Sequence, residues 1–137
     1  MKSFFYKYIL QYLLQNTKSQ ICKYFYHIYV KCTITHYSAG MNGKVSYYHD
    51  RYGLEADAVL HLKDGRYALT EFKLGSKEID MGARHLCEIE RLIANHNKKE
   101  KQVPLRLPDL KLIITATEYG YMREDGVYVI PIGCLKN

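Results

Sequence analysis

The chain has 137 residues, a length that accommodates one domain with a single core but not two. Its 47% apolar and 25% charged residues are close to globular averages, which argues against a disordered chain. The four cysteines form no C-x-x-C pair, so neither a zinc ribbon nor a redox motif is indicated, and a reducing cytoplasm is the expected compartment.

The net charge of +6 is unevenly distributed, because residues 1–43 contain five lysines and no Asp or Glu. We expect residues 1–40 to form a basic, aromatic-rich helical segment that precedes a separate domain over residues 41–137. Such a segment favours contact with a polyanion such as DNA or with an acidic partner, although a solvated lysine face has the same composition. Neither a signal-peptide cleavage site nor an apolar run of about 18 residues is present, so neither secretion nor a membrane partner is expected.

Two helices are expected in this basic segment. Residues 3–15 repeat apolar side chains at helical spacing. Residues 20–37 are rich in Tyr and β-branched side chains, whose propensity is ambiguous between helix and strand, and we expect a helix. The alternation of Lys and Tyr there is similar to a stacking platform for nucleic-acid bases, whereas aromatic residues at helical spacing also fit a stripe that faces the core.

The remainder of the chain alternates between strand and helix patterns. Ser76 is expected to cap a helix that runs to about residue 95 and is followed by a polar surface loop. Alternating and β-branched runs predict strands over residues 44–49, 54–62, 66–74, 110–116 and 127–132. From residue 20 on, the order is therefore α-β-β-β-α-β-β, an α/β (α+β) fold.

The predicted hairpin over residues 54–74 has two plausible registers. A two-residue turn would place the polar residues of one strand on the same face as the apolar residues of the other. A three-residue loop over residues 63–65, with Gly65 in the left-handed conformation, gives one coherent apolar face and sets Asp57 opposite Glu71. We therefore expect the three-residue loop.

In this register the carboxylates of Asp57 and Glu71 face each other, with their Cβ atoms ~5 Å apart. Like charges so placed repel unless a proton or a cation lies between them, so Asp57→Ala is expected to stabilise the metal-free protein. Mg²⁺ or Mn²⁺ would relieve the repulsion, because both prefer hard oxygen ligands. Lys73 would lie on the same face, where an ammonium stabilises charge developing on a phosphate. The alternative is an exposed face on which Glu55 and Lys73 form a surface ion pair worth under ~1 kcal/mol.

These residues carry a resemblance to known families. The pattern D-x13-E-F-K over residues 57–73, on the second and third strands of an αβββαβ order, resembles the PD-(D/E)XK nuclease superfamily. Residues 50–75 (DRYGLEADAVLHLKDGRYALTEFKLG) and 124–133 (EDGVYVIPIG) are similar, more closely, to a C-terminal domain of unknown function found in bacterial AAA-family ATPases. The resemblance covers roughly residues 36–137.

The resemblance implies a restriction-endonuclease-like core, a mixed sheet flanked by helices. Asp57 and Glu71 would bind Mg²⁺ or Mn²⁺ together with the backbone carbonyl of Phe72. Lys73 would be the catalytic lysine, and the activity would be metal-dependent hydrolysis of phosphodiester bonds in DNA. The alternative is a catalytically inactive accessory or binding module of an AAA-family ATPase.

Two features depart from these families. Superfamily enzymes often carry an acidic residue on the first core helix, and residues 1–43 contain none. The G-x-x-x-x-G-K-[ST] motif is absent as well, so we expect a detached or truncated piece without the ATPase module. Three secondary site candidates remain: Glu55, Arg84, which is expected to meet a phosphate, and His85, whose helix is expected to pack near the site.

Overall fold

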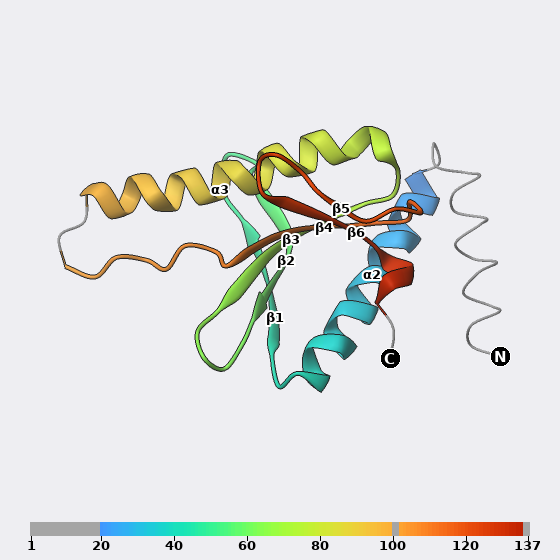
Figure 1. Ribbon diagram of the computed structural model, residues 1–137, viewed down its shortest axis with the longest axis horizontal. Helices are drawn as coiled ribbons and strands as arrows, with labels where there is room; N and C mark the ends of the chain where they lie inside the picture. The colour runs from blue at the N-terminus through green and yellow to red at the C-terminus, as the bar shows by residue number, and fades with distance from the viewer. Residues whose placement is uncertain (1–19, 100–101, 136–137) are drawn as a thin grey trace.

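The computed structural model describes residues 20–99 and 102–135, which form two long helices on a six-stranded mixed sheet (Figure 1). The helices are α2 (Gln20–Gly40) and α3 (Ile79–Lys99), with short 3-10 turns η1 (Ser76–Glu78) and η2 (Ile132–Cys134). The strands are β1 (Lys44–His49), β2 (Glu55–His61), β3 (Tyr67–Lys73), β4 (Leu110–Thr115), β5 (Tyr121–Met122) and β6 (Val127–Pro131). The helix expected over residues 3–15 lies outside the described residues.

The sheet has the strand order β1-β2-β3-β4-β6-β5. The first three strands form an antiparallel meander, α3 carries the chain from β3 to the parallel strand β4, and β6 is parallel to β4. The predicted α-β-β-β-α-β-β order is thus confirmed as a mixed α+β fold. The two-residue strand β5, antiparallel to β6, was not predicted, because so short a run has no detectable alternation.

The segment with ambiguous propensity, α2, is a helix because its apolar side chains recur every fourth residue. Its buried positions are Cys22, Tyr26, Val30, Ile34 and Ser38. The residues halfway between them, at positions 24, 28, 32 and 36, are exposed, whereas a strand would place them on the same face as the buried ones. The buried Tyr26 hydroxyl donates a 3.0 Å hydrogen bond to the Ile114 carbonyl oxygen on β4. Although the expected boundary at residue 40 would separate α2 from the sheet, its stripe belongs to a core cluster that includes β2, β3 and β4 residues.

The second helix, α3, covers the opposite face of the sheet (Figure 1). Its buried face is an apolar stripe in which Ile79, Ala83, Leu86 and Ile89 are buried and Ile93 is partly buried. Its expected beginning is wrong: Ser76 is the first residue of the turn η1, and the residue at the capping position is Gly75, which has no side chain to form a capping bond. The α-helix proper begins at Ile79.

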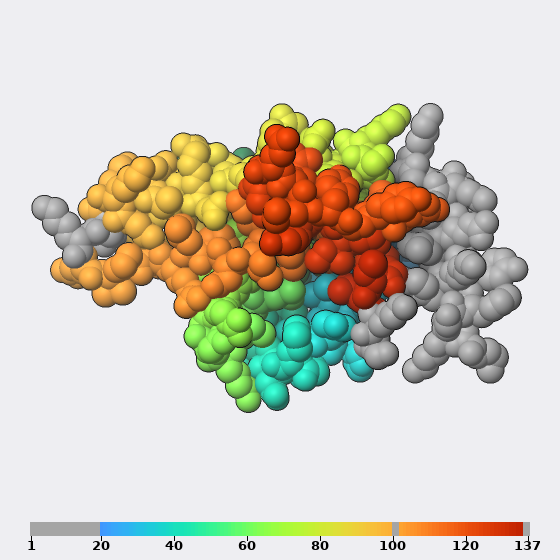
Figure 2. Space-filling model, in the orientation of Figure 1, coloured from blue at the N-terminus to red at the C-terminus, as the bar shows by residue number. Residues whose placement is uncertain are grey.

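The end of α3 also lies beyond the expected position, at Lys99 rather than near residue 95. The Asn97 side chain accepts a hydrogen bond from Leu105 N–H at 2.8 Å and donates one to the Leu105 carbonyl at 2.7 Å. The last turn is therefore held against the segment that follows it. In the space-filling view this segment (orange) lies along the C-terminal half of α3 (yellow) (Figure 2).

Over residues 20–99 and 102–135, neither long helix contains an apolar stretch sufficient to cross a bilayer. All four cysteines lie in this part of the chain, and all are free thiols.

Candidate functional site

The site depends on the register of the β2–β3 hairpin, and the three-residue loop is confirmed. Ala58 pairs with Thr70 and His61 with Tyr67, as that loop requires. Gly65 has a φ of 86°, a left-handed conformation that is unfavourable for residues with a Cβ.

A bulge in β2 interrupts the alternation of side chains at the candidate site. Ser46 of β1 pairs with Val59, whereas Tyr48 pairs with Ala56, so two steps along β1 correspond to three along β2. The extra residue lies at Asp57–Ala58, and a bulge of this kind turns a side chain toward the other face. Consistently, Ala56 and Val59 both belong to the core cluster under α3, while Ala58 belongs to the cluster under α2.

The bulge places the Asp57 carboxylate on the α2 side of the sheet. Its Oδ2 accepts a 2.7 Å hydrogen bond from the backbone N–H of Phe72. Its Oδ1 lies 3.8 Å from Nδ1 of His27 on α2. The expectation that Asp57 and Glu71 face each other across one surface is therefore wrong, because the pairing of two undistorted strands on which it rested ends at Ala58–Thr70.

Glu71 instead points toward α3, where its side chain is 1% exposed. Lys73 Nζ lies 2.6 Å from Oε2, and His85 Nδ1 lies 3.1 Å from Oε1. The contact with Lys73 is a close ion pair that lacks the direction of a hydrogen bond, which leaves Oε2 as a buried acceptor without a well-directed donor. Gly82 of α3 leaves room for this arrangement, since a Cβ there would be 3.0 Å from Cε of Lys73.

Burial is the main cause that raises the pKa of Glu71 above its ordinary value. Lys73 opposes this shift in the Glu71 pKa, the Asp57 charge adds to it, and the hydrogen bond with His85 again opposes it. Asp57 and Glu71 thus influence each other electrostatically although they occupy different faces. The repulsion predicted between them is present in sign, but the closest contacts of Glu71 are with Lys73 and His85.

The other predicted site residues divide between the two faces. Glu55 is exposed and lines the same groove as Asp57, whereas Arg84 and His85 line a second groove on the α3 side. The Phe72 side chain is buried under α2. Because the N–H and C=O groups of one strand residue point the same way, the Phe72 carbonyl is directed toward the edge at which Asp57 bonds its N–H.

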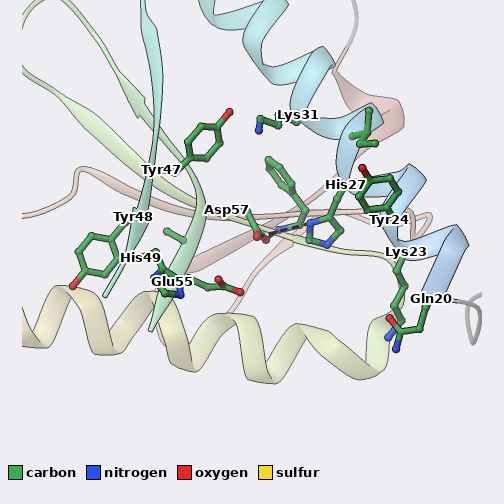
Figure 3. A pocket seen from close by; sticks show the side chains of 13 residues that line it. Gln20, Lys23, Tyr24, His27, Lys31, Tyr47, Tyr48, His49, Glu55 and Asp57 are labelled. Carbon is green, nitrogen blue, oxygen red and sulfur yellow. Dashed lines mark hydrogen bonds and ion pairs between the residues drawn. The ribbon is translucent and has the colours of Figure 1, made fainter. Parts of the chain in front are cut away.

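His27 is a site residue that the sequence did not reveal. It lies on α2, and its Nδ1 is 3.8 Å from Oδ1 of Asp57. Its ring also meets the Phe72 ring edge-on, with 5.7 Å between centroids. Figure 3 shows His27 beside Asp57 in a groove of about 690 Å³ between α2 and the β1–β2 strands. His27 could not be predicted as a site residue from the sequence, because a single histidine in a helix is most often structural or solvent-exposed.

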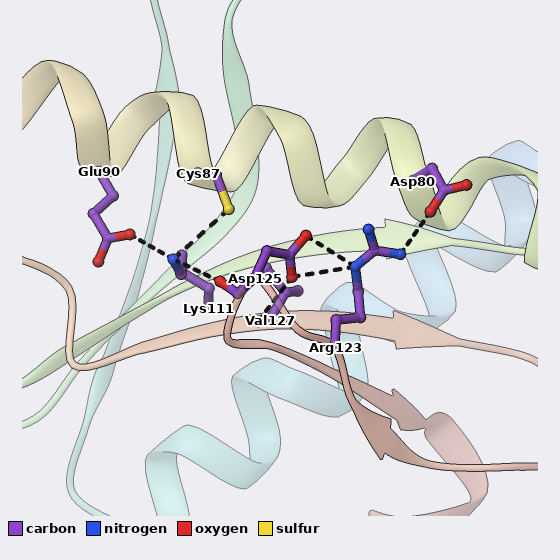
Figure 4. Close-up of polar contacts among 7 residues, drawn as sticks. All are labelled: Asp80, Cys87, Glu90, Lys111, Arg123, Asp125 and Val127. Carbon is purple, nitrogen blue, oxygen red and sulfur yellow. Dashed lines mark hydrogen bonds and ion pairs between the residues drawn. The ribbon is translucent and has the colours of Figure 1, made fainter.

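A separate polar cluster ties α3 to the C-terminal strands (Figure 4). Lys111 on β4 forms an ion pair with Glu90, and its Nζ is 3.7 Å from Sγ of Cys87. Arg123 bridges Asp80 at 2.6 Å and Asp125 at 3.1 Å. The Lys111 contacts join α3 to β4, and the Arg123 contacts join α3 to the turn between β5 and β6, so we interpret the cluster as structural.

Within residues 20–99 and 102–135, no group of three or more His, Cys, Asp or Glu side chains is arranged to hold a metal ion. A metal ion at the predicted site would therefore rely on two carboxylates, Asp57 and Glu71, with a backbone carbonyl and water. Mg²⁺ is commonly held in this way, by one or two carboxylates with retained waters and substrate phosphates.

Comparison with protein-family models gives one match, a model described as "Domain of unknown function (DUF4143)", over residues 27–135. The matched range includes most of α2, the entire sheet and η2. Searches of curated proteins and of solved structures gave no match.

Proposed function

We propose that this chain, which belongs to the family of the domain of unknown function DUF4143, is a nuclease-like module that binds DNA and hydrolyses a phosphodiester bond with the help of Mg²⁺ or Mn²⁺. The α-β-β-β-α-β order, with β3 and β4 parallel, is the arrangement expected of a restriction-endonuclease-like core. The free thiols of all four cysteines favour a reducing cytoplasm as its location.

The observation that carries the proposal is the hydrogen bond from Phe72 N–H to Asp57. It brings the Asp57 carboxylate to the backbone beside Glu71, while Lys73 lies 2.6 Å from Glu71. The four groups proposed for the site therefore form one continuous set of contacts where β2 separates from β3.

The donor atoms of this set fit a hard divalent cation. Asp57 and Glu71 would hold it together with the Phe72 carbonyl, and the buried Glu71 Oε2 lacks a well-directed hydrogen bond. The fit requires the Lys73 ammonium to leave Oε2. When bound, such an ion supplies Lewis acidity and activates a water for attack on phosphorus.

The residues of the chain would have distinct roles in that reaction. The carboxylates of Asp57 and Glu71 would bind the divalent cation and orient it. Lys73, which contacts Glu71, would once released from it stabilise the negative charge that develops on the phosphate oxygens.

A second candidate function is a catalytically inactive accessory module of an AAA-family ATPase, a class of protein with which this family is commonly associated. The specific observation in its favour is that both oxygens of Glu71 are already engaged by Lys73 and His85 in a 1% exposed position. In this case the three side chains would only fasten α3 to the sheet.

Calorimetric titration with Mn²⁺ and a plasmid-nicking assay separate the two functions. The hydrolysis proposal expects Mn²⁺ binding that is lost in Asp57→Ala and Glu71→Ala and unchanged in the exposed control Glu124→Gln. Lys73→Ala is expected to bind Mn²⁺ at least as well as the wild type, because its ammonium no longer competes for Glu71, and yet to nick no DNA. If the wild type binds no Mn²⁺, the accessory function alone remains.

A further inference from the structure

The groove above Asp57 has two unlike walls and encloses about 690 Å³ (Figure 3). One wall is α2, which presents Lys23, His27 and Lys31, and the other is β1 with Tyr47. The figure shows Lys31 and Tyr47 approaching each other from the two walls. Asp57 lies on the floor, with its side chain 16% exposed.

The α2 wall carries cationic or protonatable groups at intervals of one helical turn. Lys23, His27 and Lys31 recur every fourth residue and so share one face. From Lys23 to Lys31 the helix rises roughly 12 Å, the rise of three to four stacked nucleotides at about 3.4 Å each. No Asp or Glu occurs in α2.

The two lysines are available to a phosphate. Lys23 forms an ion pair with Glu78, but their side chains are 35% and 29% exposed, and pairs of this kind contribute little because water and salt screen them. Lys31 Nζ lies 4.2 Å above the Tyr47 ring and covers this face of it, so a base that stacks on this face would displace the ammonium toward the phosphates.

Exposed aromatic rings complete the groove. Tyr24 on α2 is 66% exposed and Tyr47 on β1 is 55% exposed. Flat, accessible rings beside lysines are the elements that bind single strands, in which bases stack on the rings while the cations follow the phosphates.

We propose that this groove binds single-stranded DNA, with bases stacked on Tyr24 and Tyr47 and phosphates along Lys23 and Lys31. A duplex does not fit these contacts, because its bases are already stacked on each other and present no free face. The proposal deepens the proposed function by naming the form of the substrate, and it rests on that function only for cleavage at Asp57.

The test is fluorescence anisotropy of the full chain with a labelled single-stranded oligonucleotide and with the same sequence annealed to its complement, both in EDTA. We expect the single strand to bind at least tenfold more tightly. Tyr24→Ala and Tyr47→Ala should each weaken binding of the single strand about five- to 100-fold. Tyr24→Phe and Tyr47→Phe should retain it, since the ring remains, and the exposed control Tyr119→Ala should have no effect.

The lysines are tested by the dependence of binding on salt. Lys23→Gln and Lys31→Gln should each reduce the slope of log K against log salt by about 0.7, whereas Lys63→Gln, in the β2–β3 loop, should not change it. Equal affinity for single strand and duplex, or full affinity in the Tyr24→Ala/Tyr47→Ala double variant, would overturn the proposal.

The chelator keeps this result independent of hydrolysis. A chain that binds single strands through the two tyrosines but never nicks DNA with Mn²⁺ refutes the proposed activity and leaves the groove intact. A chain that nicks DNA but shows no preference for single strands supports the proposed hydrolysis and refutes the proposal that the groove binds single strands.

Discussion

At the scale of single residues, the main feature is the buried carboxylate of Glu71. A carboxylate that is 1% exposed would be costly to bury alone, and Lys73 and His85 compensate its charge from β3 and α3. This arrangement accounts for an acidic residue in the middle of a core strand without requiring a bound cation. It also makes the protein sensitive to the removal of either partner.

Lys73→Ala is expected to lower the free energy of unfolding by about 3 kcal/mol at neutral pH, because it leaves a buried carboxylate with one partner fewer. Urea unfolding followed by circular dichroism measures the change, with the exposed Lys77→Ala as control. A loss no greater than that of the control would mean that the ion pair contributes nothing to stability.

Glu71→Gln is expected to change the pH dependence of stability. Since the pKa of Glu71 is raised in the folded state, the folded protein binds the proton more tightly than the unfolded chain. Its stabilisation is complete below the unfolded pKa of about 4.3 and is lost as the pH rises through the raised value. In that interval the stability of the wild type relative to Glu71→Gln should fall by up to about 1.4 kcal/mol per pH unit.

Urea titrations between about pH 4 and pH 8 in EDTA test this dependence, with Glu124→Gln as a control for a surface charge. If the free energy of unfolding of the wild type, relative to that of Glu71→Gln, rose with pH, the result would contradict the direction of the shift in the Glu71 pKa.

At the scale of elements, the bulge in β2 determines what the site looks like. In an undistorted hairpin the N–H of Phe72 would bond the backbone of Ala56, because hydrogen-bonded pairs recur at every second residue from Leu62–Arg66. The bulge replaces this bond with one to the Asp57 side chain. Asp57 is thus part of the sheet's hydrogen bonding as well as of the floor of the groove.

Asp57→Ala is therefore expected to destabilise the metal-free protein by about 2 kcal/mol, since it removes a charged acceptor from a backbone donor. This reverses the stabilisation expected from carboxylate repulsion alone. Asp57→Asn keeps an acceptor oxygen and should lose less. Urea unfolding in EDTA measures both variants, and a gain in stability for Asp57→Ala would restore the repulsion as the dominant effect.

The helices and strands followed from local patterns, whereas the site required long-range information. The coherent apolar face and the three-residue loop with Gly65 identified the hairpin register from neighbouring residues alone. The propensity of α2 was ambiguous, and its buried stripe from Cys22 to Ser38 is seen only in the structure. The bulge depends on how β1 pairs with β2. His27 reaches Asp57 only after α2 has packed on the sheet. Neither the bulge nor the contact between His27 and Asp57 can be recognised in a local run of residues.

At the scale of the whole molecule, the sheet is covered on both faces and each cover supplies part of the site. The α2 face supplies His27 and the lysines of the groove, and the α3 face supplies His85 and Arg84. The edge strands are β1 and the two-residue β5. The candidate site thus lies where β2 passes between two helical layers.

Removal of residues 1–40 is expected to abolish cooperative unfolding of the remaining chain. It would expose the apolar cluster that includes Phe72, Leu74 and Ile114 and that α2 covers. The measurement is urea unfolding of a chain that starts at residue 41, followed by circular dichroism and tyrosine fluorescence. Coincident, sigmoidal transitions with an unchanged midpoint would show that the domain begins after α2.

The position of Glu71 between strand and helix links occupancy of the site to the docking of α3. His85 holds Glu71 from α3 at 3.1 Å, so a ligand that drew this carboxylate away would release a polar tie between helix and sheet. Thermodynamic linkage is reciprocal: whatever shifts α3, a neighbouring module included, would in turn alter how strongly the site holds its ligand.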